Sequence, residues 1–205
     1  MPHPEIPYDK GVIHGRFQVL HNDHLNYLLA GKALCRHLVV GITNPEPLLV
    51  GEEEADPHRS DPLANPLTYY ERYCLVKTLL LKQGLAPREF SVVPLPINFP
   101  DRYAHYVPMD AVFFVAIYDA WGERKLHYFR SLGLRTHILR KVSEEEKGLS
   151  ASDIRRAMLN DDPWTHLVPP SVADLLSQWN LAARLKKLCR SADLGSADLG
   201  SNLDL

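Results

Sequence analysis

The amino-acid sequence contains no long hydrophobic run and no strong excess of charge of either sign. Its longest apolar stretches fall far short of the roughly 20 residues that a membrane-spanning helix needs, so we expect no membrane association. The formal net charge is −2 at pH 7 and the pI is near 6.5, whereas general nucleic-acid binders carry a strongly basic surface. Small anionic molecules are therefore the expected partners, and nucleic acids are not.

Cysteine is also scarce, and Cys35, Cys74 and Cys189 stand far apart in the chain. An odd number of separated cysteines is typical of free thiols in a reducing compartment, and the spacing matches no metal site. Residues 1–10 lack the apolar segment of a secretory signal, so the sequence predicts a cytoplasmic protein. Cys35 and Cys74 fall in apolar stretches that we expect to be helical, where cysteine usually packs in the core instead of acting as a nucleophile.

Short β-branched or apolar runs alternate with segments of helical periodicity. We expect strands at residues 11–13, 38–42, 90–95, 111–116 and 136–139. We expect helices at residues 24 to about 33, 68 to about 82, 121–132, 150–159 and 170 to about 188. Thr68 with Glu71, and Ser150 with Asp153, have the capping-box spacing at two of these helix starts. This order predicts an α/β fold with a doubly wound parallel sheet and further helices at the C-terminus.

Residues 1–190 contain enough apolar sequence for one substantial core, and we interpret them as a single domain. Residues 191–200 consist of two copies of the sequence Ser-Ala-Asp-Leu-Gly. We expect residues 191–205 to form a flexible tail, because this repeat is small, polar and too short for a repeat architecture. Another irregular segment, residues 44–66, contains five prolines and is expected to be a long surface loop.

The segment from His14 to His24 lies between the first expected strand and the first expected helix, where a parallel sheet presents its ligand crevice. Gly15 allows the backbone to approach a phosphate, and Arg16 supplies a permanent cation. His21 and His24 flank the first turn of a helix whose free N–H groups attract anions. The pattern indicates a phosphate site in which two imidazoles donate hydrogen bonds to a triphosphate during its displacement.

Two histidines three residues apart have other interpretations, namely surface or core residues, or half of a zinc site. No further ligand is spaced to complete a tetrahedral zinc site, and a second helix start favours the phosphate site. Ser150 and Ser152 place hydroxyl and backbone N–H groups there, and Arg155, one turn later, is directed back to the same end. Two such helix starts in one small α/β domain fit a nucleoside triphosphate.

These two motifs together carry a family resemblance. Gly15-Arg16-Phe17-Gln18 followed by a His-x-x-His, with the late Ser-x-Ser and Ile154-Arg155, resembles the nucleotidyltransferase superfamily of adenylyl- and cytidylyltransferases. Within it, the chain is most similar to the archaeal-type nicotinamide-nucleotide adenylyltransferases. The likeness covers nearly the whole chain before residue 191 and includes residues 65–68, 71–72, 94–98, 106–108, 154–158, 164 and 167–169.

The resemblance implies a Rossmann-like nucleotidyltransferase fold, a homo-oligomer, and Mg²⁺ bound together with ATP. It also implies that an acceptor phosphate attacks the α-phosphorus in line, with no covalent enzyme intermediate and no metal ligand from the protein. The catalytic residues that it implies are Arg16, His21, His24 and Arg155. The nucleotide-binding residues that it implies are Gly15, Arg16, Phe17, His21, His24, Ser150, Ser152, Ile154 and Arg155. The acceptor-binding residues that it implies are Ile97, Asn98, Tyr103 and Trp121. Tyr103 and Trp121 also have a second interpretation, as ordinary core aromatics.

Three features depart from the family pattern. Asp23 stands where the family usually has glycine in His-x-Gly-His, and it adds bulk and negative charge beside the nucleotide. Residues 117–121 replace a small polar turn, which alters the expected acceptor pocket. The loop at residues 44–66 is longer than is typical, and its Arg59 is either a phosphate contact or a solvated surface arginine.

The leading hypothesis from the sequence is transfer of AMP from ATP to nicotinamide or nicotinate mononucleotide, which gives the dinucleotide (NAD or its acid form) and pyrophosphate. The departures keep open a cytidylyl- or adenylyltransferase for another phosphorylated or phosphonylated metabolite. A third hypothesis is a nucleotide-binding regulator without turnover, which the intact Arg16, His21, His24 and Arg155 disfavour.

Overall fold

The computed structural model describes residues 6–46, 61–118, 120–142 and 148–198. A five-stranded sheet with the order β3-β2-β1-β4-β5 lies at its centre, and each pair of neighbouring strands is parallel. The strands are β1 (Tyr8–Gly15), β2 (Cys35–Thr43), β3 (Phe90–Leu95), β4 (Val112–Ile117) and β5 (Arg135–Lys141). The expected doubly wound α/β fold is confirmed, and each of the five expected strands is present.

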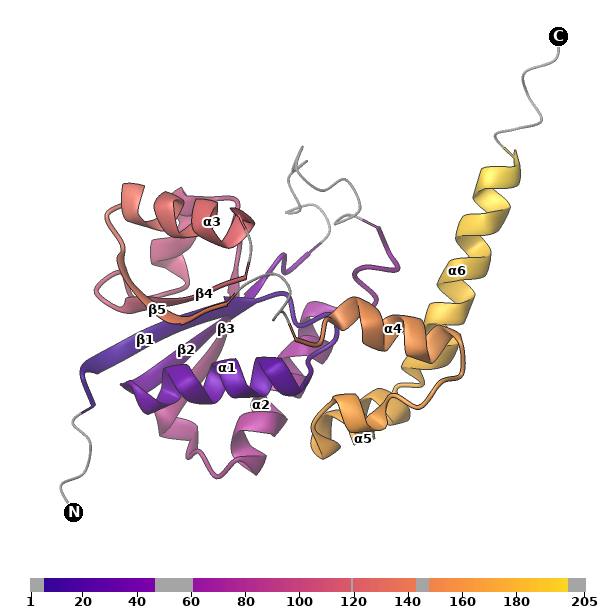
Figure 1. Ribbon diagram of the computed structural model, residues 1–205, viewed down its shortest axis with the longest axis horizontal. Helices are drawn as coiled ribbons and strands as arrows, with labels where there is room; N and C mark the ends of the chain where they lie inside the picture. The colour runs from indigo at the N-terminus through magenta and orange to yellow at the C-terminus, as the bar shows by residue number, and fades with distance from the viewer. Residues whose placement is uncertain (1–5, 47–60, 119, 143–147, 199–205) are drawn as a thin grey trace, which may run out of the picture.

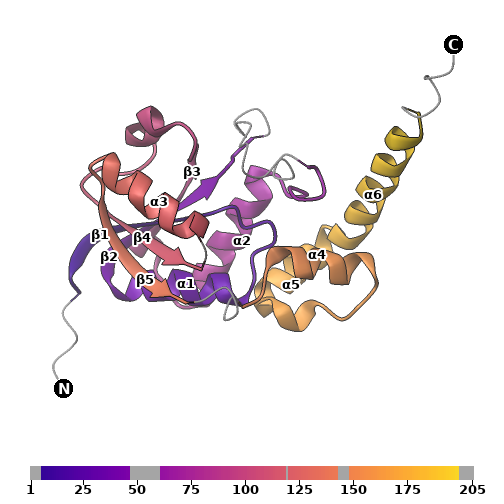
Figure 2. The same ribbon diagram turned by 45° about the horizontal axis from the view of Figure 1, so that its top comes forward.

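Helices cover both faces of the sheet, with α1 and α2 on one face and α3 on the other (Figure 1). The α-helices are α1 (Asn22–Ala33), α2 (Tyr69–Lys82), α3 (Ala120–Ser131), α4 (Ala151–Leu159), α5 (Pro170–Gln178) and α6 (Leu181–Asp198). Short 3₁₀ helices are η3 (Pro87–Glu89), η4 (Pro100–His105) and η6 (Thr165–Leu167). Figure 2 shows that α4, α5 and α6 lie together beside the sheet and that α6 extends away from it.

The two faces of the sheet form two hydrophobic clusters. Consecutive residues of a strand point to opposite faces, and accordingly Ile13 of β1 packs in the cluster beneath α1 and α2 while Val12 packs in the cluster beneath α3. All residues of β4 are buried, as expected for a parallel strand that is covered on both sides. The central strands β1 and β4 therefore form a rigid base for the loops at their ends.

Both expected capping boxes are present. The Thr68 hydroxyl accepts a hydrogen bond from the backbone N–H of Glu71 (3.2 Å), and the Thr68 N–H donates to the Glu71 carboxylate (2.8 Å). The Ser150 hydroxyl accepts from the N–H of Asp153 (3.3 Å), and the Ser150 N–H donates to the Asp153 carboxylate (3.1 Å). Each pair satisfies N–H groups that a helix start leaves without intrahelical partners.

The C-terminal helices differ from the expected single helix over residues 170–188. The structure has two helices there, because the chain turns at Asn180, whose φ of 50° lies in the left-handed region that asparagine tolerates. The second of them, α6, continues to Asp198. Part of the segment that was expected to be a flexible tail is therefore helical, and residues 199–205 lie outside the described part.

An ion pair holds α6 to the start of α2. Arg184 donates to both carboxylate oxygens of Glu71, at 2.7 and 2.9 Å, and to the carbonyl oxygen of Pro66 at 3.0 Å. Such two-pronged pairs fix orientation as well as distance. Glu71 thus serves two purposes, since the same carboxylate also caps α2.

The cysteines are free thiols in the structure. Cys35 is the first residue of β2, so the expectation that it lies in a helix is wrong, but the expectation that it is a core residue is confirmed by its complete burial. Burial raises the pKa of the Cys35 thiol to about 11, which keeps it protonated. Arg59 lies outside the described residues, as does most of the expected surface loop around it. No described helix has the length and apolar composition to cross a membrane.

Candidate active site

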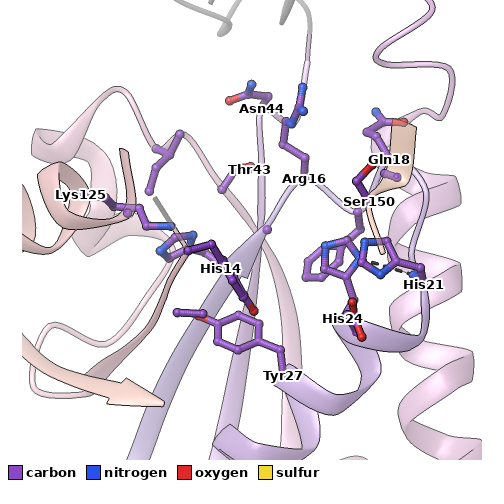
Figure 3. Close-up of a pocket in the computed structure, with 18 of the residues that line it drawn as sticks. His14, Arg16, Gln18, His21, His24, Tyr27, Thr43, Asn44, Lys125 and Ser150 are labelled. Atoms are coloured by element: carbon purple, nitrogen blue, oxygen red, sulfur yellow. Dashed lines mark hydrogen bonds between the residues drawn. The ribbon is translucent and has the colours of Figure 1, made fainter. Parts of the chain in front are cut away.

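A cavity of about 720 Å³ opens at the C-terminal ends of β1, β2 and β4. This is the edge at which parallel sheets bind ligands, next to the point where the strand order reverses between β1 and β4. Its wall combines the loop after β1, the start of α1, the ends of β2 and β4, the residues before η4, the first turns of α3 and the start of α4. Figure 3 shows side chains from several of these segments. The fold thus brings together the motifs that the sequence placed about 130 residues apart.

The loop after β1 provides Gly15, Arg16 and Phe17 to the cavity wall, as expected. A Cβ atom at Gly15 would lie 2.9 Å from the ring of Phe17, and Phe17 itself is almost fully buried. Glycine is therefore required here by the close packing of the Phe17 ring. This packing, and not only the approach of a phosphate, explains the glycine at the end of β1.

His21 and His24 face each other at the start of α1 (Figure 3), with ring centroids 3.8 Å apart. The backbone N–H of His21 donates to Nδ1 of His24 over 3.4 Å. This contact places the proton of a neutral His24 on Nε2. The Nε2–H group of His24 is therefore available as a hydrogen-bond donor.

Burial keeps both imidazoles neutral. It lowers the pKa of His21 to about 4, although the charges of Asp23 and Asp153 oppose the change. Burial also lowers the pKa of His24 well below its usual value, and the neighbouring His21 and Arg16 lower it further. Near pH 7 the pair therefore presents neutral N–H donors and nitrogen acceptors, and the positive charge of the cavity comes from arginine and lysine.

Arg72, on α2, holds the backbone at the C-terminal ends of β1 and β2 in place. Its side chain is almost fully buried. Nη1 donates to the carbonyl oxygens of Arg16 (3.0 Å) and Thr43 (2.7 Å), and Nη2 donates to the carbonyl oxygen of Asn44 (2.8 Å). No sequence pattern indicates this role, and Arg72 is part of the family resemblance only.

The late motif is joined to the early one through Arg155. Its Nη1 donates to the carbonyl oxygen of Gln18, and its Nη2 donates to the hydroxyl of Ser152 at 3.0 Å. Ser150 and Ser152 line the cavity, whereas Arg155 lies directly behind Gln18 and Ser152 and is not among the lining residues. Burial lowers the pKa of Arg155 to about 10, so the guanidinium is still charged at neutral pH.

Ile154 was also expected to contact the nucleotide. It is completely buried within the core beneath α1 and α2 and is not among the lining residues. Its role in the structure is to anchor α4, so that Ser150 and Ser152 at the start of this helix are held at the cavity.

The expected acceptor residues are only partly brought together. Ile97 and Asn98 line the cavity. Tyr103 does not, because η4 folds back and buries its ring completely, and its hydroxyl donates to the carbonyl oxygen of Ile97 over 2.5 Å. Of the two interpretations of Tyr103, the structure favours the core aromatic, and the expectation that its ring forms a wall of the acceptor slot is corrected to a position behind Ile97. Trp121 is in the first turn of α3, and its side chain lies outside the described part.

The structure adds residues from α3 that sequence reasoning missed. A Cβ at Gly122 would lie 3.1 Å from Cα of Ile117, so α3 packs closely on β4 and its first turns reach the cavity. Arg124, Lys125 and Tyr128 consequently line it. These residues reach the cavity because the strand order reverses at β4 and ligands bind next to such a reversal. The strand–helix order at residues 111–132 was the signal that could have identified them.

His14, at the end of β1, lies beside Lys125 (Figure 3). It is 7% exposed, its ring packs edge-on against Phe129, and its Nε2 has no hydrogen-bond partner among the described residues. Burial lowers the pKa of His14 well below its usual value, and the charge of Lys125 lowers it further. His14 therefore presents a neutral nitrogen to the α3 side of the cavity.

Asp23 is the one carboxylate among the described residues that line the cavity, and the arginine and lysine residues there are Arg16, Arg124 and Lys125. Within the described residues, no group of three or more His, Cys, Asp or Glu side chains is arranged to hold a metal ion. The arrangement is that of a predominantly cationic cavity with hydroxyl, amide and imidazole donors, which is suited to a polyanionic ligand.

Comparisons with known proteins agree with this chemistry. No family model matches the sequence. Over 176 residues, the chain is 48% identical to phosphonoformate cytidylyltransferase of Streptomyces viridochromogenes, and the match covers 86% of this chain and 95% of that enzyme. It is 29% identical over 191 residues to nicotinamide-nucleotide adenylyltransferase of Thermococcus kodakarensis, and this match covers 93% of this chain and 94% of that enzyme.

Among solved structures, the fold is similar to a bifunctional NMN adenylyltransferase/ADP ribose pyrophosphatase of Francisella tularensis, with a TM-score of 0.64 and 14% identity. The similarity covers 97% of this chain and 58% of that protein, and at this identity it concerns the fold alone. The 48% identity to the Streptomyces enzyme, which extends over most of both chains, shows the family as well as the fold. The chain is an enzyme that belongs to the nucleotidyltransferase family, which includes phosphonoformate cytidylyltransferase and the nicotinamide-nucleotide adenylyltransferases.

Proposed function

We propose that this nucleotidyltransferase transfers CMP from CTP to a small acid that carries a phosphonate or phosphate group, and releases pyrophosphate. The similarity to phosphonoformate cytidylyltransferase, 48% identity over 95% of that enzyme, supports this choice. The structural observation that carries it is the cationic α3 side of the cavity, where Arg124 and Lys125 lie near the buried His14. A compact acceptor with several negative charges matches these groups.

The position of Tyr103 also favours a small acceptor. A pyridine mononucleotide needs a planar slot, and Tyr103 was expected to supply one aromatic face. Its ring is instead completely buried behind Ile97, so it offers no surface for stacking. The next residue after Ile97 in the cavity wall is Asn98, whose polar amide suits a carboxylate or phosphonate better than a flat ring.

In the proposed reaction, an oxygen of the acceptor attacks the α-phosphorus of CTP in line. The bond from the α-phosphorus to the bridging oxygen breaks, and pyrophosphate leaves with the electron pair. The acceptor oxygen is ionised at neutral pH, so no strong general base is needed. Arg16 would balance charge on the phosphates, and the neutral N–H of His24 would donate to an oxygen that gains charge in the transition state.

The start of α4 supplies the other part of the proposed triphosphate site. The hydroxyls of Ser150 and Ser152 line the cavity, and they would donate to phosphate oxygens together with backbone N–H groups of the helix start. Arg155 would support them from behind through its bond to Ser152. Binding and positioning of this kind are sufficient to account for catalysis without a covalent intermediate.

Mg²⁺ is the proposed cofactor, carried on the triphosphate. Mg²⁺ commonly keeps several water ligands and takes others from substrate phosphates, which suits a cavity whose described wall has only the carboxylate of Asp23. When bound, the ion screens the negative charge of the triphosphate. The protein's part is to hold the phosphates through Arg16, Ser150 and Ser152.

Transfer of AMP from ATP to nicotinamide or nicotinate mononucleotide is the second candidate. Relatives with that named activity match at 29% identity over 93% of this chain. The observation that favours it is the presence of aromatic side chains, Tyr118 and Tyr128, on the α3 side of the cavity. Either ring offers a surface against which a pyridine could pack.

A panel of two nucleotides and three acceptors tests the proposal. The purified enzyme is given CTP or ATP with phosphonoformate, nicotinamide mononucleotide or nicotinate mononucleotide, and pyrophosphate release is measured with Mg²⁺ present. We expect release that depends on CTP and phosphonoformate together. Release only with ATP and a mononucleotide would overturn the proposal in favour of the second candidate. Mass spectrometry of the products checks that the nucleotide has been transferred and not hydrolysed.

A further inference from the structure

Asp23 has an unusual position for a carboxylate. It lies in the first turn of α1 and contributes to the wall of the cavity, whose other charged residues among those described are all cations. A carboxylate repels phosphate groups, so the phosphates of a bound nucleotide are expected to lie away from Asp23 and toward Arg16. The part of the nucleotide that faces Asp23 must instead offer a hydrogen-bond donor.

Asp23 also joins two walls of the cavity. A Cβ atom at Gly148 would lie 2.2 Å from Oδ2 of Asp23, so this carboxylate packs directly against the backbone that leads to α4. Tyr118 is on the same side. Burial raises the pKa of the Tyr118 hydroxyl, the charge of Arg140 opposes this change, and the charge of Asp23 adds to it. The Asp23 carboxylate therefore fills the space next to Gly148 and narrows this end of the cavity.

We infer that Asp23 selects the nucleobase, its carboxylate accepting a hydrogen bond from an exocyclic amino group in the narrowed end of the cavity. The inference rests on the proposed transfer of a nucleotide and specifies the base. An amino-bearing base such as cytosine satisfies the carboxylate. Uracil presents a carbonyl oxygen at the same position, which repels the carboxylate and leaves both acceptors without a donor.

The narrow end of the cavity also favours a pyrimidine, which has one ring, over a purine, which has two. Contact between Asp23 and Gly148 removes space that the smaller side chain of glycine at position 23 would leave open. A purine with an amino group satisfies the hydrogen bond but needs more room. The structure thus assigns the order CTP, then ATP, then UTP to the wild-type enzyme.

The experiment compares kcat/KM for CTP, UTP, 2′-deoxy-CTP, ATP and ITP in the wild type, Asp23→Asn and Asp23→Gly. Asp174→Asn, an exposed carboxylate on α5, is the matched control. In Asp23→Asn the side-chain amide can donate to a carbonyl oxygen, and we expect the CTP/UTP ratio to fall at least about tenfold. In Asp23→Gly we expect the ATP/CTP ratio to rise. The control should keep both ratios.

Three results would overturn the inference. An unchanged CTP/UTP ratio in Asp23→Asn removes Asp23 from base selection. An equal loss with CTP and UTP, together with lost discrimination against 2′-deoxy-CTP, assigns the carboxylate to a ribose hydroxyl. A higher Mg²⁺ requirement that is the same for every nucleotide assigns it to the metal. Thermal unfolding of each variant identifies a loss of folding, and Asp23→Ser then replaces any variant that unfolds.

The nucleotide panel also separates this inference from the proposed function. A wild-type enzyme that uses ATP and not CTP contradicts the cytidylyl transfer, and the ATP/ITP pair, which differs in the same amino group, then tests Asp23. A wild-type enzyme that uses CTP, with a ratio that Asp23→Asn does not change, contradicts the role of Asp23 alone.

Discussion

Arg72 donates a hydrogen bond of 3.0 Å to the carbonyl oxygen of Arg16, so that one buried arginine holds the backbone of another that lines the cavity. The same guanidinium also binds the carbonyl oxygens of Thr43 and Asn44. Burial lowers the pKa of Arg72 to about 10, which still leaves it charged at neutral pH. The oriented carbonyl dipoles therefore stabilise a buried cation beneath the proposed phosphate site.

Replacing Arg72 is expected to cost stability. In Arg72→Met, these carbonyl oxygens lose a buried, charged donor, and we expect the free energy of unfolding to fall by about 2–5 kcal/mol. Urea unfolding measures this. Arg36→Met is the control, because its side chain is 72% exposed, and we expect a change within about 1 kcal/mol. Equal losses in the two variants would show that the Arg72 bonds contribute little.

The histidine pair is expected to act mainly on the rate. In His21→Ala or His24→Ala, a donor or acceptor at the proposed phosphate site is lost, and kcat should fall by roughly 100-fold or more. Steady-state kinetics and a thermal unfolding curve are measured for each variant. His105→Ala, an exposed residue of η4, should leave kcat unchanged. Near-wild-type turnover in both pair variants would remove these histidines from the mechanism.

Acid should destabilise the fold through the buried histidines. His21 has a pKa of about 4 in the folded protein against a usual value of 6.5, so the unfolded chain binds the proton more tightly. Stability is then full above about pH 6.5 and falls as the pH drops toward 4. The lowered pKa of His14 acts in the same direction. Urea midpoints measured from pH 8 to pH 4 test this, and a smaller slope is expected in His14→Phe.

The role of Arg155 is expected to depend on the planar shape of its guanidinium group. In Arg155→Lys, one ammonium group cannot bind both the Gln18 carbonyl and the Ser152 hydroxyl, so the start of α4 should lose its alignment with the loop after β1. We expect a higher KM for the nucleotide or a lower kcat. Arg156→Lys is the control, because that side chain is 70% exposed. Unchanged kinetics in both variants would limit the late motif to capping its helix.

Lys125 is expected to act on the acceptor. Lys125→Met removes a charge from the α3 side of the cavity, so the KM of the acceptor should rise about tenfold while that of the nucleotide changes little. Initial rates at varied concentrations of each substrate separate the two constants. Arg130→Met, on the exposed side of the same helix, should change neither. A rise confined to the nucleotide KM would place Lys125 at the triphosphate instead.

The sequence predicts much of the fold because its signals are local. β-branched runs identify the strands, and Thr68 with Glu71 marks a helix start that the structure confirms. Cys35 shows the limit of this reasoning, since a short apolar run fits a helix and a strand equally well, and it belongs to β2. The turn at Asn180 was missed because the apolar pattern continues across it.

Site residues that belong to a sequence motif could be predicted. Site residues whose position depends on tertiary packing could not. Gly15 was predicted from the end of the first strand and His21 and Ser150 from helix starts, and the three residues line one cavity. Tyr103 was misplaced, because no periodicity reports that η4 folds back and buries the ring. Arg72 was missed for the opposite reason: a buried arginine whose described partners are all carbonyl oxygens has no recognisable partner in the sequence.

The position of the cavity between β1 and β4 has an evolutionary consequence. The helices that follow these adjacent strands leave on opposite faces of the sheet. Under the proposed function, the groups that activate the nucleotide follow β1, whereas the groups that bind the acceptor follow β4. Substitutions in α3 can then exchange one acceptor for another while the machinery for phosphorus chemistry is inherited intact. Such a division would let a single ancestral scaffold serve acceptors as different as a compact phosphonate and a mononucleotide.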